Sequence, residues 1–376
     1  MQTAEPVLRL CYAALHVVMR SGYERLGHSV AQPGLPAVIV EHIDWAATMR
    51  LRSAMDAHGI GIAEAMDTAQ RFYIGWPAAS RLIAECGKLQ LANGFCAGAG
   101  TDQLAAIRSK ADLVDAVVEQ CAFISSHGGI PVILPMPWLC AQGASENDYV
   151  EVYAAIVRQV QGPVFVHWLG EMFLPALRGY FPGESFHRVM ALDPAVVRGC
   201  KLSLLDAAFE VRVRAELLPR EQIVLTGDDF HFGRMLLGDG KPPSRSTMIG
   251  SRRVALGDFS HALLGILDAI ARPTRQALQC LAVGNSRGFL ERLERCEELG
   301  RHVFEAPTQH YKAGLAFLAW LNGLQPNFTL VNGEQRMRDR AHYLRCAELA
   351  QQADAVLDAP GFAQRLAAFT AAPWPV

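Results

Sequence analysis

Short apolar runs recur along this chain, each followed by a turn rich in Gly, Pro, Asp or Thr and then by an amphipathic stretch of helix length. This alternation is typical of an α/β fold in which right-handed helical crossovers join parallel strands. Eight such units within roughly 250 residues match a (β/α)8 TIM barrel, which is the fold we predict. A doubly wound open sheet is the alternative. The runs are Val7–Val18, Gly59–Thr68, Gln90–Thr101, Ile130–Trp138, Val164–Gly170, Val197–Leu205, Gln222–Gly227 and Arg253–Leu256.

After Leu256 the pattern changes to helix-length stretches, and no further strand is expected. A polar, Pro-containing segment before that point, residues 238–251, is expected to be a loop. We therefore predict a barrel over residues 1–272 and a helical C-terminal extension over residues 273–376 that packs on the barrel. The predicted helices are Phe259–Arg272, Asn285–Val303, Gln309–Leu321 and Arg336–Leu357.

Composition narrows the class of protein. The 376 residues are 51% hydrophobic, which is enough for a sizeable core. A formal charge of −2, without long runs of either sign, argues against a nucleic-acid partner. Nine cysteines lack any Cys-x-x-Cys spacing and suit a reducing compartment. With no signal-peptide pattern and no apolar run of about eighteen residues, we expect a cytoplasmic protein without membrane association.

One of only five lysines, Lys201, lies inside an apolar, strand-like run. An ammonium in such a place loses its hydration, and desolvation lowers the pKa of a lysine. A lysine that is partly the free amine can attack a carbonyl group and form a Schiff base. Gly199 and Ser203 flank it at strand period two, so all three are expected to face the barrel interior. A structural ion pair, with Asp206 as one candidate partner, is the alternative interpretation.

Polar side chains collect where the predicted strands end, and in a barrel these carboxyl ends carry the active site. Each of these residues also has a structural explanation of its own. A single Asp or Thr commonly caps a helix, adjacent aspartates commonly form a turn, and a histidine can be a hydrogen-bonded core residue. Their joint position at one end of the barrel favours a functional site. They are Glu64, Asp67, Thr68, Thr101, Asp102, His167, Ser203, Asp228, Asp229 and His231.

Several short motifs resemble the dihydrodipicolinate synthase and N-acetylneuraminate lyase superfamily. Residues 199–203, Gly-Cys-Lys-Leu-Ser, stand where that family has Gly-Ile-Lys-Asp-Ser, and residues 225–229, Leu-Thr-Gly-Asp-Asp, resemble its Ser-Gly-Asp-Asp turn. Pro-Val-Phe-Val-His at 163–167 is similar to its fifth strand, and Ala-Gly-Ala-Gly-Thr at 97–101 to its third-strand turn. Residues 306–315 resemble its C-terminal helix, which has a Pro-x-Lys-Ala-Ala-Leu pattern.

The resemblance covers roughly residues 40 to 320, and we identify the chain as a divergent, dihydrodipicolinate synthase-like branch of unknown function. It implies a class I aldolase barrel, a covalent lysine Schiff base without another cofactor, and a homo-oligomer. Two motifs depart from the family. Met66-Asp67-Thr68 replaces part of a Gly-Thr-Thr-Gly-Glu loop, so an anion lies where a threonine would help hold a substrate carboxylate. His167 replaces a proton-relaying tyrosine, and histidine can still move protons near neutral pH.

Our first hypothesis is a class I (Schiff-base) aldolase or lyase that acts on a small keto acid or a sugar-derived carbonyl compound. Lys201 would form the Schiff base and His167 would act as the acid and base. Because of the departures, a polyhydroxylated substrate suits the site better than bare pyruvate. The predicted substrate-binding residues are Asp67, Thr68, Thr101, Asp102, Ser203, Asp228 and Asp229.

Two alternatives use the same barrel. The first is a divalent-metal-dependent isomerase or aldolase, in which carboxylate and imidazole ligands bind the ion and Lys201 is an electrostatic partner. The second is a non-catalytic sugar-acid binding protein, because a protein that has lost its catalytic activity would also lack the proton-relaying tyrosine. The ligands available to the metal alternative are Glu64, Asp67, His167, Asp228 and His231, none of them at a recognised metal spacing.

Overall fold

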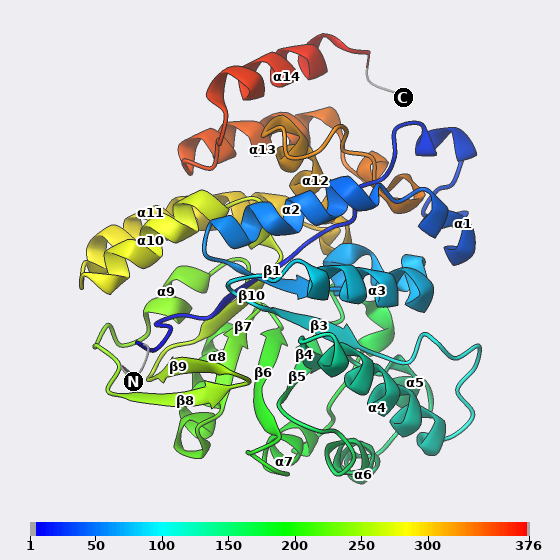
Figure 1. The fold of residues 1–376 in the computed structure, drawn as a ribbon, viewed down its shortest axis with the longest axis vertical. Helices are drawn as coiled ribbons and strands as arrows, with labels where there is room; N and C mark the ends of the chain where they lie inside the picture. The colour runs from blue at the N-terminus through cyan, green and yellow to red at the C-terminus, as the bar shows by residue number, and fades with distance from the viewer. Residues whose placement is uncertain (1–4, 374–376) are drawn as a thin grey trace. The chain divides into compact units, whose positions relative to one another are not determined.

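A computed structural model describes residues 5–373 and contains a closed barrel of eight strands (Figure 1). Around the barrel the strand order is β1-β10-β7-β6-β5-β4-β3-β2. The parallel pairing of β3 through β7 in chain order confirms the predicted (β/α)8 barrel. The barrel strands are β1 Cys11–Ala14, β2 Gly61–Glu64, β3 Phe95–Ala99, β4 Ile130–Ile133, β5 Val164–Leu169, β6 Val197–Ser203, β7 Ile223–Thr226 and β10 His261–Leu264.

Helices alternate with the strands, and polar caps set where several of them begin. Ser109 and Ser145 each form a capping box with an aspartate three residues later, so that both side chains satisfy backbone N–H groups. Asp44 and Asp206 cap two further helices, each through one side-chain oxygen that accepts from the backbone N–H three residues later. The helices up to the last barrel strand are α1 Pro36–Glu41, α2 Trp45–Ala57, α3 Arg71–Lys88, α4 Lys110–Ser126, α5 Pro137–Ala141, α6 Glu146–Val157, α7 Ser185–Met190, α8 Ala207–Leu217 and α9 Phe232–Leu237.

The eighth barrel strand is not the one predicted. The run at Arg253–Leu256 belongs to β9 (Arg252–Leu256), which pairs antiparallel with β8 (Arg245–Ile249) in a two-stranded sheet outside the barrel. The expected loop at 238–251 therefore contains a strand. Barrel strand β10 lies inside the predicted helix Phe259–Arg272, so that prediction was wrong too. An unbroken apolar stretch does not distinguish a buried strand from a helix by periodicity.

Within the part of the chain that the structure describes, five helices follow the barrel strands. The predicted helices at Asn285–Val303, Gln309–Leu321 and Arg336–Leu357 correspond to α11, α12 and α13, with Asn285 as the N-cap of α11. Helix α12 is buried on nearly every side, as its apolar sequence indicates. The five are α10 Ala271–Ala282, α11 Ser286–Val303, α12 Lys312–Leu321, α13 Arg340–Gln352 and α14 Ala359–Ala371.

The 3-10 helices are η1 Tyr23–Leu26, η2 Asp67–Ala69, η3 Pro175–Leu177, η4 Leu218–Arg220, η5 Ile266–Asp268, η6 Thr308–His310 and η7 Val331–Met337.

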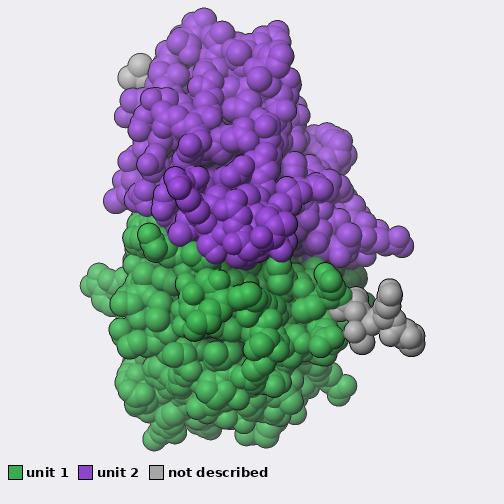
Figure 2. Space-filling view, turned by 90° about the vertical axis from the view of Figure 1, so that its left-hand side faces the viewer, with its two compact units in different colours: residues 1–12, 94–264 green, residues 13–93, 265–376 purple. Residues whose placement is uncertain are grey.

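The chain packs as two compact units (Figure 2). Unit 1 consists of residues 1–12 and 94–264, and unit 2 consists of residues 13–93 and 265–376. The predicted boundary at residue 272 divides the chain by element type, whereas these units divide it by packing. Unit 2 joins α1–α3 to the C-terminal helices. Within the described residues, no helix has the length and apolar character required to span a membrane.

Candidate active site

His167 and Lys201 are in-register partners on the neighbouring parallel strands β5 and β6. Both are buried, with 1% and 7% of their surface exposed. Trp168, the residue after His167, packs against Phe186 of α7 and Phe209 of α8, so it faces the helical layer. Because side chains alternate along a strand, His167 faces the barrel interior, and its in-register partner Lys201 faces the same way.

Ser203 completes this group two residues after Lys201 on β6. Its Oγ lies 3.2 Å from Nε2 of His167, within hydrogen-bond distance, and Ser203 is also buried. The other ring nitrogen of His167, Nδ1, is buried and has no hydrogen-bond partner among residues 5–373. Asp206, the candidate ion-pair partner of Lys201, caps α8 by accepting from the backbone N–H of Phe209. Unit 1 thus brings together an amine, an imidazole and a hydroxyl.

Burial and a neighbouring charge fix the protonation state of His167. Desolvation, followed by the positive charge of Lys201, holds the pKa of His167 well below its ordinary value. The imidazole is therefore neutral at pH 7 and has a lone pair with which to accept a proton. A neutral histidine beside a lysine is suited to proton transfer rather than to holding an anion.

Two glycines leave room for this group. A Cβ atom on Gly227 would lie 2.3 Å from Oγ of Ser203 and 2.6 Å from the carbonyl oxygen of Leu202. One on Gly199 would lie 2.1 Å from the carbonyl oxygen of Ile223, so a side chain there would separate β6 from β7. The glycines in these two motifs are thus required by close packing around β6.

Asp228 holds the turn after β7. Its Oδ1 accepts hydrogen bonds from the backbone N–H groups of Phe230 and His231, at 2.9 and 3.2 Å. Its Oδ2 lies 3.0 Å from Nδ1 of His231. Both carboxylate oxygens therefore interact within the turn that leads into α9. This agrees with the alternative that adjacent aspartates form a turn. Asp229, which follows it, is buried as well.

Gln120 stabilises the turn that contains Thr101 and Asp102 through two hydrogen bonds. Its Oε1 accepts from the backbone N–H of Gly100 at 2.6 Å, and its Nε2 donates to Oδ1 of Asp102 at 3.0 Å. Ser109 is the N-cap of α4, so neither Thr101 nor Asp102 caps that helix. The helix-cap explanation of these two residues is therefore wrong.

Asp67 and Thr68 belong to unit 2, where they lie beside Tyr311 and Lys312. The hydroxyl of Tyr311 donates to Oδ2 of Asp67 at 2.9 Å and lies 2.7 Å from Oγ1 of Thr68. The ammonium of Lys312 is 3.4 Å from the same Asp67 oxygen. The anion that replaces the family's threonine is thus neutralised by a buried cation.

Lys312 is the second buried lysine, and its surroundings favour the protonated form. Burial alone would lower its pKa, but the carboxylates of Asp67 and Glu334 outweigh burial and raise it. Glu334 in turn pairs with His310 at 3.1 Å, and its pKa is lowered by Lys312 and His310 against the effect of burial. Sequence reasoning did not identify this cluster. The only signal was Lys312 itself, within the motif compared with the family's C-terminal helix.

Glu210 on α8 was also missed, because a charged residue on a helix usually faces solvent. It is 2% exposed and accepts hydrogen bonds from Oγ of Ser260 at 2.7 Å and Oγ1 of Thr226 at 2.9 Å. Burial raises the pKa of Glu210 to about 7. Thr226 Oγ1 also accepts from the backbone N–H of Asp228 at 3.3 Å, so Glu210 is linked to the turn after β7.

The metal alternative loses one of its ligands. Glu64 uses both carboxylate oxygens on Arg52, at 2.8 and 2.9 Å, and both side chains are fully buried. The backbone N–H of Ala65 donates to Oε1 as well. A carboxylate held in this way is a structural anion rather than a ligand for a metal ion.

Solved structures with the same fold come from the superfamily named by the sequence motifs. A dihydrodipicolinate synthase from Agrobacterium tumefaciens is 15% identical over 92% of this chain and 97% of its own, with a TM-score of 0.60. One from Aquifex aeolicus is 12% identical over 93% and 100%, also with a TM-score of 0.60. An N-acetylneuraminate lyase from Fusobacterium nucleatum, solved with pyruvate, is 13% identical over 93% and 98%, with a TM-score of 0.62. At such identities the likeness establishes the fold.

No curated protein matches the chain by sequence. One family model, described as "Protein of unknown function (DUF993)", matches residues 1–372, which is nearly the whole chain. The sequence motifs predicted a divergent branch of unknown function, and both the description of the matched family and the barrel shared with the dihydrodipicolinate synthase structures agree with that prediction. The chain belongs to the DUF993 family.

Proposed function

We propose that this protein is a class I aldolase or lyase in which Lys201 forms a Schiff base with a small keto acid or a sugar-derived carbonyl compound. The observation that carries the proposal is the buried pair of Lys201 and neutral His167, in register on β5 and β6. The Fusobacterium nucleatum lyase adds support, because its structure has the same fold and was solved as a complex with pyruvate.

The chemistry needs an amine, a proton acceptor and a proton donor. Lys201 gives up a proton, its Nζ attacks the carbonyl carbon, and the carbonyl oxygen leaves as water when the iminium forms. Neutral His167 takes one proton from Lys201, and the hydrogen bond to Ser203 gives it a route by which to return that proton to the oxygen. The second proton that the oxygen needs to leave as water comes from the nitrogen of the carbinolamine, which keeps one hydrogen in the iminium. The iminium then withdraws electrons from the adjacent bond, which is cleaved or formed.

The remaining polar residues favour a substrate that carries hydroxyl groups. We propose Thr101, Asp102 and Asp229, which all belong to unit 1, as substrate contacts, because hydroxyl and carboxylate oxygens can form hydrogen bonds with substrate hydroxyl groups. Asp228, occupied within its turn, would position the loop.

Borohydride trapping tests the proposal. The chain is incubated with pyruvate and with longer hydroxylated keto acids, reduced, and measured by intact mass and by peptide mapping. We expect one adduct per chain, on the peptide that contains Lys201. Lys201→Arg should abolish the adduct, whereas Lys241→Arg, at an exposed lysine, should keep it. An adduct on another lysine, or none with any carbonyl compound, would contradict the assignment.

A further inference from the structure

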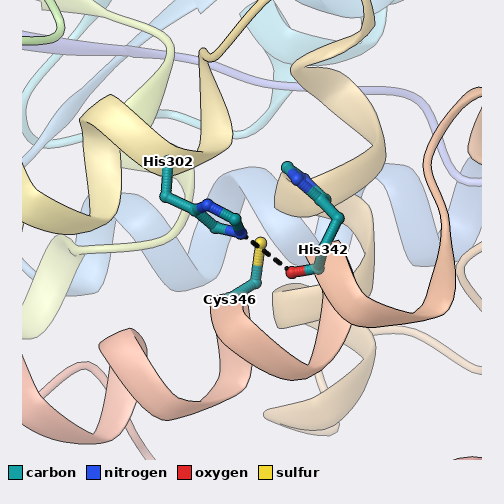
Figure 3. Close-up of side chains that lie close together, drawn as sticks. All are labelled: His302, His342 and Cys346. Atoms are coloured by element: carbon teal, nitrogen blue, oxygen red, sulfur yellow. Dashed lines mark hydrogen bonds between the residues drawn. The ribbon is translucent and has the colours of Figure 1, made fainter.

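Three side chains with metal-binding atoms gather on two C-terminal helices of unit 2 (Figure 3). His302 lies in the last turn of α11, and His342 and Cys346 lie four residues apart on α13. Each can present one donor atom, and the three atoms lie within 4.8 Å of one another. In Figure 3 the ring of His302 extends toward the sulfur of Cys346. Imidazole and thiolate ligands together favour Zn²⁺ over Mg²⁺ or Ca²⁺.

Glu305 lies behind both imidazoles. Its Oε1 is 2.8 Å from Nδ1 of His342, and its Oε2 is 3.5 Å from Nδ1 of His302. A histidine that binds a metal usually donates its second ring N–H to a carboxylate, which fixes the ring and its tautomer. Because Glu305 faces both Nδ1 atoms, the two Nε2 atoms are the ones that would bind the ion.

The Nε2 atom of His342 is a second, independent sign of a ligand. It is buried and has no hydrogen-bond partner within the described part of the chain, although buried polar atoms are nearly always paired. The corresponding atom of His302 lies 3.0 Å from the backbone oxygen of His342. It donates this bond, so ion binding must move the proton to Nδ1, where Glu305 accepts it.

The distances require only side-chain adjustment. Zn–N bonds of about 2.0–2.1 Å and Zn–S bonds of about 2.3 Å place tetrahedral ligands roughly 3.3–3.6 Å apart. The donors, now within 4.8 Å of one another, must therefore approach by about 1.5 Å at most. The rings of His302 and His342 are stacked with centroids 4.4 Å apart, so rotation about their side-chain bonds makes this approach. The side chain of His302 is 18% exposed, which gives an entry path.

We propose that His302, His342 and Cys346 bind one Zn²⁺ or a chemically similar transition-metal ion, with water as the fourth ligand and Glu305 orienting the imidazoles. Cys346 loses its thiol proton to solvent when the ion binds. The site uses none of the residues assigned to the Schiff base. Because its ligands come from α11 and α13, the ion would join the two helices and stabilise the folded chain.

Cobalt titration of the full chain tests the site. After chelator treatment, Co²⁺ should bind with one equivalent and produce the near-ultraviolet charge-transfer band of a cobalt–thiolate bond, and Zn²⁺ should displace it. Cys346→Ala should lose the band. Cys296→Ala, at a buried cysteine on α11 outside the cluster, should keep it. Glu305→Gln should weaken Zn²⁺ binding about 10–100-fold while leaving the band in place.

A second readout covers the case in which Cys346→Ala does not fold. His302→Gln changes a partly exposed side chain, and the variant should fold but bind Zn²⁺ at least tenfold more weakly. Zn²⁺ should raise the melting temperature of the unsubstituted chain and of Cys296→Ala, and not that of His302→Gln. If the unsubstituted chain shows no cobalt–thiolate band, or if His302→Gln responds to Zn²⁺ equally, the metal site is refuted and the cluster is a hydrogen-bonded packing contact.

Discussion

Replacing Glu210 by glutamine should change the pH dependence of stability in a way that isolates one buried carboxyl group. Its pKa is raised from an ordinary 4.5 to about 7, chiefly by burial. Between these two pH values the folded chain holds a proton that the unfolded chain has released. The free energy of unfolding therefore falls as the pH rises through this window, and the loss is complete above about pH 7.

The magnitude follows from the same two values. The difference between 4.5 and about 7, at roughly 1.4 kcal/mol for each pKa unit, corresponds to about 3.5 kcal/mol. Glutamine removes this cost because it does not ionise. The glutamine side chain has one oxygen, whereas the Glu210 carboxyl group has two that accept from Ser260 and Thr226. One of these two hydroxyl groups therefore loses its acceptor, which lowers the free energy of unfolding by about 1 kcal/mol.

The two effects predict a reversal of sign. At pH 8 the Glu210→Gln chain should be more stable than the unsubstituted chain by about 2.5 kcal/mol, and at pH 4, below both pKa values, it should be less stable by about 1 kcal/mol. Urea unfolding followed by circular dichroism at both pH values measures the difference directly. Glu298→Gln makes the same chemical change at an exposed position of α11 and should show no reversal.

The reasoning is refuted if Glu210→Gln destabilises the chain equally at both pH values. That result would mean that the carboxyl group keeps its ordinary pKa in the folded chain, with its charge compensated inside unit 1. A reversal in Glu298→Gln would show instead that the pH dependence arises elsewhere in the chain.

Three further substitutions probe the two polar clusters. His167→Asn should lose most turnover of any carbonyl substrate found by trapping while circular dichroism stays unchanged, because it removes the neutral base; an unchanged kcat would reduce His167 to a packing residue. Gly227→Ala should lower stability by about 1–3 kcal/mol in urea unfolding, since its Cβ would lie 2.3 Å from Oγ of Ser203. Asp67→Asn should destabilise the chain by about 3–5 kcal/mol by leaving the buried ammonium of Lys312 with one carboxylate fewer, which melting curves would register.

Two matched controls separate these effects from general damage. Gly100→Ala adds a methyl group whose nearest neighbours lie at 3.6 Å, an ordinary contact distance, so it should cost less than Gly227→Ala. Asp115→Asn removes an exposed carboxylate on α4 and should leave the melting temperature nearly unchanged. If Gly100→Ala lost as much stability as Gly227→Ala, the close-packing explanation would be wrong. If Asp115→Asn lost as much stability as Asp67→Asn, the ion-pair explanation would be wrong.

The sequence was informative wherever local pattern decides the structure. Strand period two placed Lys201 and Ser203 on one face of β6, and a helix-length run capped by Asn285 located α11. It failed at β10, whose residues His261–Leu264 lie within a longer apolar stretch. There the choice between strand and helix depends on pairing with β7, which is a tertiary contact that periodicity does not report.

The polar clusters were beyond sequence reasoning for the same physical reason. Lys312 meets Asp67 across 245 positions of the chain (312 − 67), and Glu210 meets Ser260 across 50. Composition around each residue says nothing about such a partner. The pKa of a buried group depends on which distant charge compensates it, so the protonation of Lys312 and of Glu210 could be read only from the folded chain.

The position of β10 has a consequence for the synthesis of the protein. It is the strand between β1 and β7 in the barrel, and its residue Ala262 donates a backbone hydrogen bond to Leu10 at 2.8 Å. At about 5–20 residues per second, the ribosome releases β10 many seconds after the first strand, and until then the nascent sheet has two open edges. Unpaired edges of apolar strands are where chains aggregate. A truncation before residue 264 should therefore yield an aggregating chain rather than a smaller barrel, and production in cells should depend on chaperones that shield those edges.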